Sequence, residues 1–211
     1  MERQIKVIKG NWNWGVALDL HTKSSIPIFN DDGEITGWDT ERTEIGEELY
    51  RLKYWTSEND ALKAKRVGKL SSEVVKVINE IIKLVKDKKD IDLNISCIIP
   101  VPPSKTRGFQ PVIEMAKVVR EKSGIPLNLS LLKKIKSTEQ LKEIEDEQER
   151  EEILRDAFDV EENILSGQNV ILFDDLYRSG ATLKAITTIL KNKGKAKNVI
   201  VITLTKTRIK K

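Results

Sequence analysis

The chain contains one cysteine, one histidine and no long apolar run. The lone cysteine, Cys97, excludes an intramolecular disulfide and a four-cysteine zinc site. It lies in the apolar run 95–99, which indicates a buried structural thiol rather than a nucleophile. There is no stretch of about 18 consecutive apolar residues and no apolar signal core near residue 1, so we expect neither a membrane span nor a secretory leader. The expected location is the cytoplasm.

Neither sign of charge is in large excess. The 37 Lys and Arg residues outnumber the 33 Asp and Glu residues by a formal net charge of +4. This balance is compatible with nucleic acid or polyphosphate partners but requires neither. The chain has 211 residues, without an internal repeat or a low-complexity linker. That length can bury a sizeable core, so one domain with a modest appendage is expected.

Residues 1–42 are expected to form an N-terminal β-rich extension, a possible hood over a binding site. Strand-like runs at 5–8 and 16–20 precede a turn signal at 30–33. Aromatic residues are concentrated in this part of the chain, because the first 55 residues hold all four tryptophans, Trp12, Trp14, Trp38 and Trp55. Their indole rings could stack on a nucleobase, although an ordinary small core is the favoured interpretation.

Residues 43–211 are expected to form an α/β domain. Apolar periodicity predicts helices at 43–55 and 67–86, with a start signal inside the second at 71–73. The pattern then alternates between strand and helix, with segments at 95–101, 111–121, 138–155, 169–173, 181–193 and 198–205. Uniformly apolar strands separated by helices are typical of a mostly parallel central sheet with helices on both faces.

The segment 170–183 carries the strongest functional signal. A buried-type strand ends in Asp174 and Asp175, and a loop with Ser179, Gly180 and Thr182 leads into a helix. Ligands of open α/β sheets bind at the carboxyl ends of strands, and free amides at a helix start favour an anion. Carboxylates repel phosphate but accept hydrogen bonds from hydroxyls. The combination predicts a sugar phosphate site. A simple turn with a helix cap is the alternative, and the complete order of the segment favours the site.

Residues 173–182, Phe-Asp-Asp-Leu-Tyr-Arg-Ser-Gly-Ala-Thr, resemble the phosphoribosyl pyrophosphate motif of type I phosphoribosyltransferases. The resemblance implies the fold of that family. It also implies that Asp174 and Asp175 bind the ribose hydroxyls and, through water, Mg²⁺. The 5′-phosphate would then be bound by the loop residues Arg178, Ser179, Gly180, Ala181 and Thr182.

The resemblance extends upstream to the competence protein ComF branch of the family. Residues 99–110 resemble its proline-rich pyrophosphate loop and its Arg-Gly-Phe element. This implies that Pro102, Pro103 and Ser104 form the loop and that Lys105 and Arg107 contact pyrophosphate, where cations make chemical sense. Considered alone, the two cations would be read as part of a solvated loop. The branch also has matching residues at Thr138, Gln140, Arg150 and 157–158.

Two departures limit this resemblance. ComF proteins usually carry an N-terminal zinc-binding cysteine cluster, which this sequence lacks. Purine-salvage relatives tend to have an acid at the position of Arg178, and an arginine cannot serve as that base. The arginine therefore argues against a role in purine salvage. No set of base-reading residues in the sequence identifies the acceptor.

The resemblance implies a phosphoribosyltransferase that uses phosphoribosyl pyrophosphate and Mg²⁺ to ribosylate a nitrogen acceptor, such as a nucleobase, and that acts as a homodimer. Two alternatives remain open because fold alone does not choose an activity. One is a non-catalytic regulator that binds phosphoribosyl pyrophosphate or a nucleotide and acts with nucleic acid. The other is a phosphoribosyl hydrolase. The lone histidine, His21, either lies over the acceptor pocket or has a hydrogen-bonded structural role, which is the favoured interpretation.

Overall fold

The computed structural model describes residues 1–55, 57–89, 93–104, 108–136, 153–154 and 156–208. Its elements follow in the order β1 (Lys6–Val7), β2 (Trp14–Leu20), β3 (Thr22–Phe29), β4 (Ile35–Arg42), α1 (Glu44–Tyr54), α2 (Asp60–Lys89), β5 (Ile95–Pro100), α3 (Pro111–Ser123), β6 (Lys133–Lys134), β7 (Phe158–Asp159), β8 (Asn169–Tyr177), α5 (Ala181–Asn192) and β9 (Asn198–Lys206). In this part of the chain, no helix has the length and apolarity needed to cross a bilayer.

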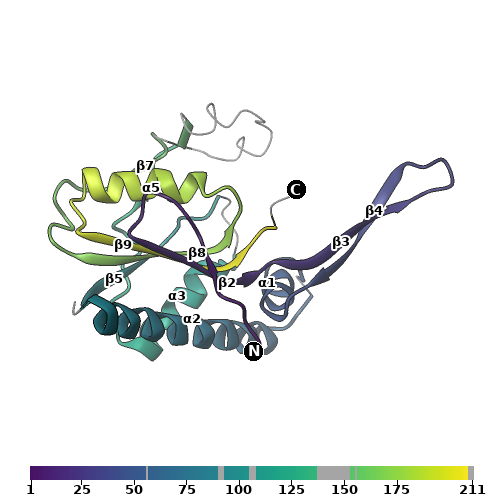
Figure 1. Ribbon diagram of the computed structural model, residues 1–211, viewed down its shortest axis with the longest axis horizontal. Helices are drawn as coiled ribbons and strands as arrows, with labels where there is room; N and C mark the ends of the chain where they lie inside the picture. Colours follow the sequence, from purple (N-terminus) through teal and green to yellow (C-terminus); the bar gives the residue numbers. More distant parts are fainter. Residues whose placement is uncertain (56, 90–92, 105–107, 137–152, 155, 209–211) are drawn as a thin grey trace.

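A five-stranded sheet forms the centre of the molecule, in the order β1-β2-β9-β8-β5. Its four longer strands pair in parallel, and the short β1 pairs antiparallel to β2 at one edge. Helix α5 covers one face, while α1, α2 and α3 cover the other (Figure 1). The interior strands β8 and β9 alternate their apolar side chains between the two cores, as strand geometry requires. The predicted α/β architecture, mostly parallel with helices on both faces, is confirmed.

The helices predicted at 43–55, 67–86, 111–121 and 181–193 are present as α1, α2, α3 and α5, and α2 starts earlier than expected. Helix α2 begins well before residue 67, where Asn59 accepts a hydrogen bond from the backbone N–H of Leu62 at 2.9 Å. The expected start at 71–73 is wrong, because Ser71 and Glu73 are buried within the helix. The Ser71 hydroxyl donates to the carbonyl of Met115 in α3 at 3.2 Å, so it ties two helices together. The charged helix predicted at 138–155 lies outside the described residues, apart from 153–154.

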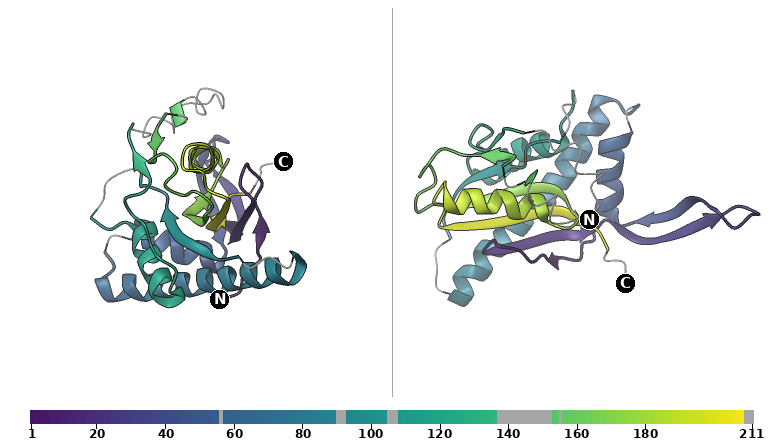
Figure 2. Two further views of the ribbon diagram at one scale, coloured as in Figure 1. Left: turned by 90° about the vertical axis from the view of Figure 1, so that its left-hand side faces the viewer. Right: turned by 90° about the horizontal axis from the view of Figure 1, so that it is seen from above.

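The structure corrects the prediction that residues 1–42 form one extension. Strand β2 pairs in parallel with β9 from Trp14 to Leu20, and β1 pairs with β2, so both strands belong to the central sheet. Only β3 and β4 project from the body, as a long antiparallel hairpin (Figures 1 and 2). The strand-like run at 16–20 suits an interior strand as well as a hairpin strand. Its partner lies near the other end of the chain, where a local pattern cannot reveal it.

The turn of the hairpin is where the sequence predicts it. Asn30 accepts hydrogen bonds through Oδ1 from the backbone N–H groups of Asp32 and Glu34. Gly33 has a φ of 80°, a left-handed conformation that glycine adopts at little cost. The hairpin leaves the sheet directly after the carboxyl end of β2 and returns to the start of α1.

The base of the hairpin is fastened by Thr43, the N-cap of α1. Its hydroxyl donates to the carbonyl of Leu20 at 2.6 Å and accepts from the backbone N–H of Gly46 at 3.0 Å. Gly46 packs so closely on the carbonyl of His21 that a Cβ there would collide with it. The start of α1 is therefore held against the end of β2.

Replacing Thr43 with valine removes both hydrogen bonds while keeping the buried shape. We expect the free energy of unfolding to fall by about 1–2 kcal/mol. Thr43→Ser keeps the hydroxyl and should fall within about 0.5 kcal/mol of the parent. Urea denaturation of the three proteins measures this difference, and equal stabilities for the valine and serine variants would contradict it.

Candidate functional site

The four parallel strands of the central sheet end at the same edge. Strand β2 ends at Leu20, β5 at Pro100, β8 at Tyr177 and β9 at Lys206. Because their carboxyl ends lie together, side chains from distant parts of the sequence meet there. Two pockets lie at this edge, and both are lined by residues of the predicted sugar phosphate segment.

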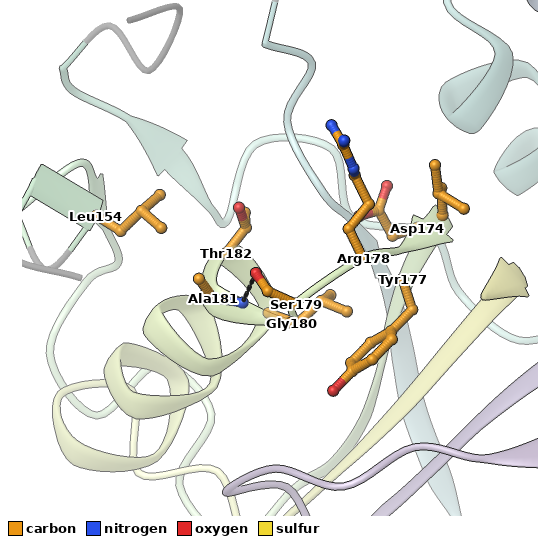
Figure 3. A pocket seen from close by; sticks show the side chains of 10 residues that line it. Leu154, Asp174, Tyr177, Arg178, Ser179, Gly180, Ala181 and Thr182 are labelled. Carbon is orange, nitrogen blue, oxygen red and sulfur yellow. Dashed lines mark hydrogen bonds between the residues drawn. The ribbon is translucent and has the colours of Figure 1, made fainter. Parts of the chain in front are cut away.

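The first pocket, of about 410 Å³, lies at the start of α5 (Figure 3). Its lining includes all five residues predicted to hold a phosphate, namely Arg178, Ser179, Gly180, Ala181 and Thr182. Gly180 is the N-cap of α5 and has no side chain to cap the helix, and the first turn carries no acidic residue. The N–H groups of this first turn and the positive end of the helix dipole are thus available to an anion.

The conformation of the loop depends on Gly180. Its φ is 82°, and an added Cβ would lie 2.6 Å from the ring of Tyr177. That ring is itself fixed, because its hydroxyl donates to the carbonyl of Lys9 at 3.3 Å and its edge meets Trp12 at a centroid distance of 6.3 Å. Ser179 adds a weak contact, accepting from the backbone N–H of Ala181 at 3.4 Å. Only glycine fits this position without strain.

The second pocket, of about 290 Å³, adjoins the first and shares Asp174, Arg178 and Thr182 with it. The predicted pyrophosphate loop reaches this pocket, since its lining includes Pro102, Pro103 and Ser104. The ammonium of Lys134 lies 3.4 Å from the carbonyl of Pro103 and 3.3 Å from that of Ser104. The structure therefore brings the predicted pyrophosphate loop and the acid pair together. Lys105, Arg107, Thr138, Gln140 and Arg150 lie outside the described residues.

Asp174 and Asp175 lie near the carboxyl end of β8, where Asp174 pairs with Thr203 of β9. The backbone N–H of Asp175 donates to Oδ1 of Asp174 at 2.8 Å. Burial raises the pKa of Asp174 to about 8, the charge of Asp175 adds to the shift, and the Asp175 N–H and Lys53 oppose it. The protonated form of Asp174 is therefore favoured more strongly than that of a solvent-exposed aspartate.

The pocket also contains a residue that the sequence did not reveal, Lys53. Its ammonium lies 2.8 Å from Oδ2 of Asp175, and the two side chains are 21% and 14% exposed. Burial lowers the pKa of Lys53, but the Asp175 carboxylate raises it more, and the net shift is upward. Lys53 lies at the end of α1, far from the motif in sequence. Helical periodicity shows only that it neighbours the buried Leu52, so no local signal indicates its partner.

His21 lies at the same edge but lines neither pocket. Its backbone N–H donates to the carbonyl of Lys206 at 2.8 Å, and its Nδ1 lies 3.1 Å from the Thr205 hydroxyl. Burial lowers the pKa of the imidazole, and the nearby cations of Arg42 and Lys53 lower it further. The hydrogen-bonded role that the sequence favoured fits this position.

The tryptophans do not line either pocket. Trp12 is buried and donates through Nε1 to the carbonyl of Ile8 at 3.0 Å, so it belongs to the core. Trp38 on the hairpin and Trp55 after α1 are exposed. Cys97 is a buried free thiol with a pKa raised by burial, as expected of a structural cysteine.

The acid pair suits a hard cation only in part. Carboxylate oxygens are ligands that Mg²⁺ accepts, and this ion commonly takes one or two carboxylates together with substrate phosphates. Within the described ranges, no group of three or more His, Cys, Asp or Glu side chains is placed to hold a metal by itself. Asp174 and Asp175 therefore fit a Mg²⁺ ion that arrives with a phosphorylated ligand.

The first prediction for this site concerns Gly180. Gly180→Ala combines a strained φ with the collision against Tyr177, and we expect it to lower the free energy of unfolding by about 2–3 kcal/mol. Gly33→Ala is a matched control, since Gly33 has a similar φ of 80° with nothing within 4 Å of an added Cβ. It should cost only about 1 kcal/mol. Urea denaturation compares the two, and equal costs would show that Tyr177 does not restrict the loop.

The second prediction concerns the pKa of Asp174, about 8 against an ordinary 3.8. Between these values the folded protein holds a proton on Asp174 that the unfolded chain releases, so the contribution of Asp174 to stability falls as pH rises and levels off above pH 8. Asp174→Asn cannot ionise. It should gain stability relative to the parent across this window, by at most about 1.4 kcal/mol per pH unit.

Urea denaturation at about pH 5, 7 and 9 measures this difference. Asp31→Asn, at the exposed hairpin turn, is the control and should keep the slope of the parent. A constant difference between Asp174→Asn and the parent at all three pH values would rule out the raised pKa.

Comparisons with known proteins leave the family unassigned. No protein-family model and no curated protein matches this chain. Leishmania donovani UMP synthase is similar in structure at 12% identity, covering 85% of this chain and 28% of its own, with a TM-score of 0.37. The allosteric regulatory enzyme of purine biosynthesis is similar at 20% identity, covering 84% of this chain and 34% of its own, with a TM-score of 0.45. This chain thus spans about a third or less of each of these two chains, and likenesses of this degree do not by themselves assign an activity to it.

Proposed function

We propose that this chain has the type I phosphoribosyltransferase fold and transfers the phosphoribosyl group of phosphoribosyl pyrophosphate to a nitrogen acceptor. One observation carries the proposal. At the carboxyl edge of a parallel sheet, the helix start at Gly180, which has no side-chain cap, lies next to the adjacent carboxyls of Asp174 and Asp175. The first feature suits a phosphate and the second suits a diol, and a ribose phosphate contains both.

The 5′-phosphate is assigned to the first pocket. Residues 178–182 line it at the start of α5, and the dipole of α5 favours a negative group there. Arg178 is exposed and borders both pockets, so its guanidinium is available to a phosphate oxygen. A cation at this position cannot serve as the base that purine-salvage relatives use, which argues against that acceptor class.

The ribose and the pyrophosphate are assigned to the second pocket. Asp174 and Asp175 accept hydrogen bonds from the ribose hydroxyls, and the 102–104 loop borders the space for the pyrophosphate. Lys105 and Arg107 follow directly in the sequence and are proposed to bind the leaving group. Asp174 and Asp175 would hold Mg²⁺ through water, and the bound ion would help to neutralise the charge of the pyrophosphate.

In the proposed reaction, the bond between C1 of the ribose and a pyrophosphate oxygen breaks, and its electron pair leaves with the pyrophosphate. The lone pair of the acceptor nitrogen forms the new C1–N bond, and the proton of that nitrogen passes to solvent. The transition state has oxocarbenium character, as in other glycosyl transfers. The protein contributes by holding the two ends of the donor so that C1 is exposed to the acceptor.

Calorimetric titration with phosphoribosyl pyrophosphate and Mg²⁺ tests the site. The parent should bind, and Asp174→Asn/Asp175→Asn should bind at least about a hundredfold more weakly, because the ribose hydroxyls lose both carboxyl groups that accept their hydrogen bonds. Asp31→Asn/Asp32→Asn is a matched control, an adjacent acid pair at the exposed hairpin turn that should leave the affinity unchanged. No binding by a folded parent would refute the proposal.

The release of pyrophosphate then separates the activities. Release that requires a nucleobase or another nitrogen acceptor supports the transferase. Release without any acceptor supports a hydrolase. Binding with no release under any acceptor supports a regulator, and its affinity for nucleic acid should then change with phosphoribosyl pyrophosphate and depend steeply on salt.

A further inference from the structure

The pocket that is assigned to the ribose and the pyrophosphate has a wall that the family motif does not account for. Helix α1 contributes Lys53 and Tyr54 to the same pocket that contains Asp175 and the 102–104 loop. We propose that Lys53 is a pyrophosphate-binding residue that acts as the counterion of Asp175 until the donor enters. This inference rests on the proposed function, because it names the partner of a side chain within that site.

The first step of the argument is that the position of Lys53 is fixed from the backbone outward. The start of α1 is held by the contacts of Thr43 and Gly46 with the end of β2. Leu49 and Leu52, on the preceding turn, are buried in the core. The backbone of Lys53 is therefore held in place. Only its flexible four-carbon side chain can move the ammonium from one partner to another.

The second step is that the dipole of α1 does not explain the direction of this side chain. Basic residues near a helix C-terminus are stabilising, and α1 has two, Arg51 and Lys53. Arg51 bonds Glu47 at 2.6 Å and stacks over Trp55 on the outside of the helix. Lys53 instead extends into the pocket and is only 21% exposed, although partial removal of an ammonium from water is costly. This placement indicates that Lys53 interacts with groups inside the pocket.

The third step concerns what happens when the ligand arrives. Lys53 contacts Oδ2 of Asp175, one of the oxygens that the ribose hydroxyls need as an acceptor. The donor also brings a pyrophosphate, which carries more negative charge than a single carboxylate, into the pocket that Lys53 lines. When the hydroxyls replace the ammonium at Asp175, the ammonium gains the pyrophosphate oxygens as its new partner. The exchange keeps both charged groups paired.

The test compares ligands that contain and lack the pyrophosphate. Lys53→Met removes the ammonium and keeps the length of the side chain. It should weaken the binding of phosphoribosyl pyrophosphate and of inorganic pyrophosphate, each with Mg²⁺, by about ten- to a hundredfold. The affinity for ribose 5-phosphate should stay within about twofold of the parent or improve, since Asp175 is freed. Calorimetric titration measures all three ligands.

Two further variants control for charge and folding. Lys69→Met removes a lysine of α2 that pairs with Glu48 of α1 away from the pocket, and it should leave all three affinities unchanged. Lys53→Arg retains a cation and should bind phosphoribosyl pyrophosphate within about threefold of the parent. It keeps the inference testable if the methionine variant does not fold, because a large loss of affinity for ribose 5-phosphate in the arginine variant would overturn it.

The outcomes separate this inference from the proposed function. A parent that does not bind phosphoribosyl pyrophosphate refutes the proposed function, and the role of Lys53 falls with it. A parent that binds, with a Lys53→Met variant of equal affinity for pyrophosphate, refutes the role of Lys53 alone. An equal loss for ribose 5-phosphate and for phosphoribosyl pyrophosphate shows that Lys53 only positions Asp175, which also overturns the inference.

Discussion

The site is organised around the cost of holding two adjacent carboxyl groups partly out of water. Asp174 and Asp175 lie within β8, directly after its buried residues 170–173, and both are only partly exposed. Two unpaired negative charges there would repel each other. The protein balances this in two ways. The pKa of Asp174 is raised to about 8, and Asp175 is paired with Lys53 at 2.8 Å. In both cases the pocket stays polar, and a charged ligand with hydroxyl groups can replace these interactions.

The part of the site that could be predicted is the part that is continuous in sequence. The strand, the acid pair, the glycine loop and the helix of residues 169–193 are adjacent along the chain, so a local pattern specifies both their order and their geometry. Gly180 illustrates this, because its left-handed φ and its helix start follow from the Ser-Gly sequence before α5. Lys53 could not be predicted. Its contact with Asp175 depends on the packing of α1 against the sheet, which no periodicity in residues 43–55 contains.

The same distinction explains the correction at the N-terminus. The positions of the turn at 30–33 and of α1 are specified by local chemistry, an asparagine-aspartate-glycine turn and a threonine cap, and both were predicted. The assignment of β2 depends on its partner β9, which lies near the opposite end of the chain. A short strand-like run identifies β2 as a strand but does not identify the strand with which it pairs. Long-range pairing is therefore what the sequence leaves undetermined, even where each strand is recognised correctly.

That one pairing also determines what the N-terminal part of the chain contributes to the site. Because β2 lies beside β9, its carboxyl end reaches the edge where β8 delivers its acids. Thr43 then ties α1 to Leu20, and the length of α1 carries Lys53 to Asp175. The helix start at α5 is a local structure and would suit many anions. Under the proposed function, selectivity for a ligand with a phosphate, a diol and a second anionic group would require α1 beside it, and that placement depends on tertiary structure rather than on the motif alone.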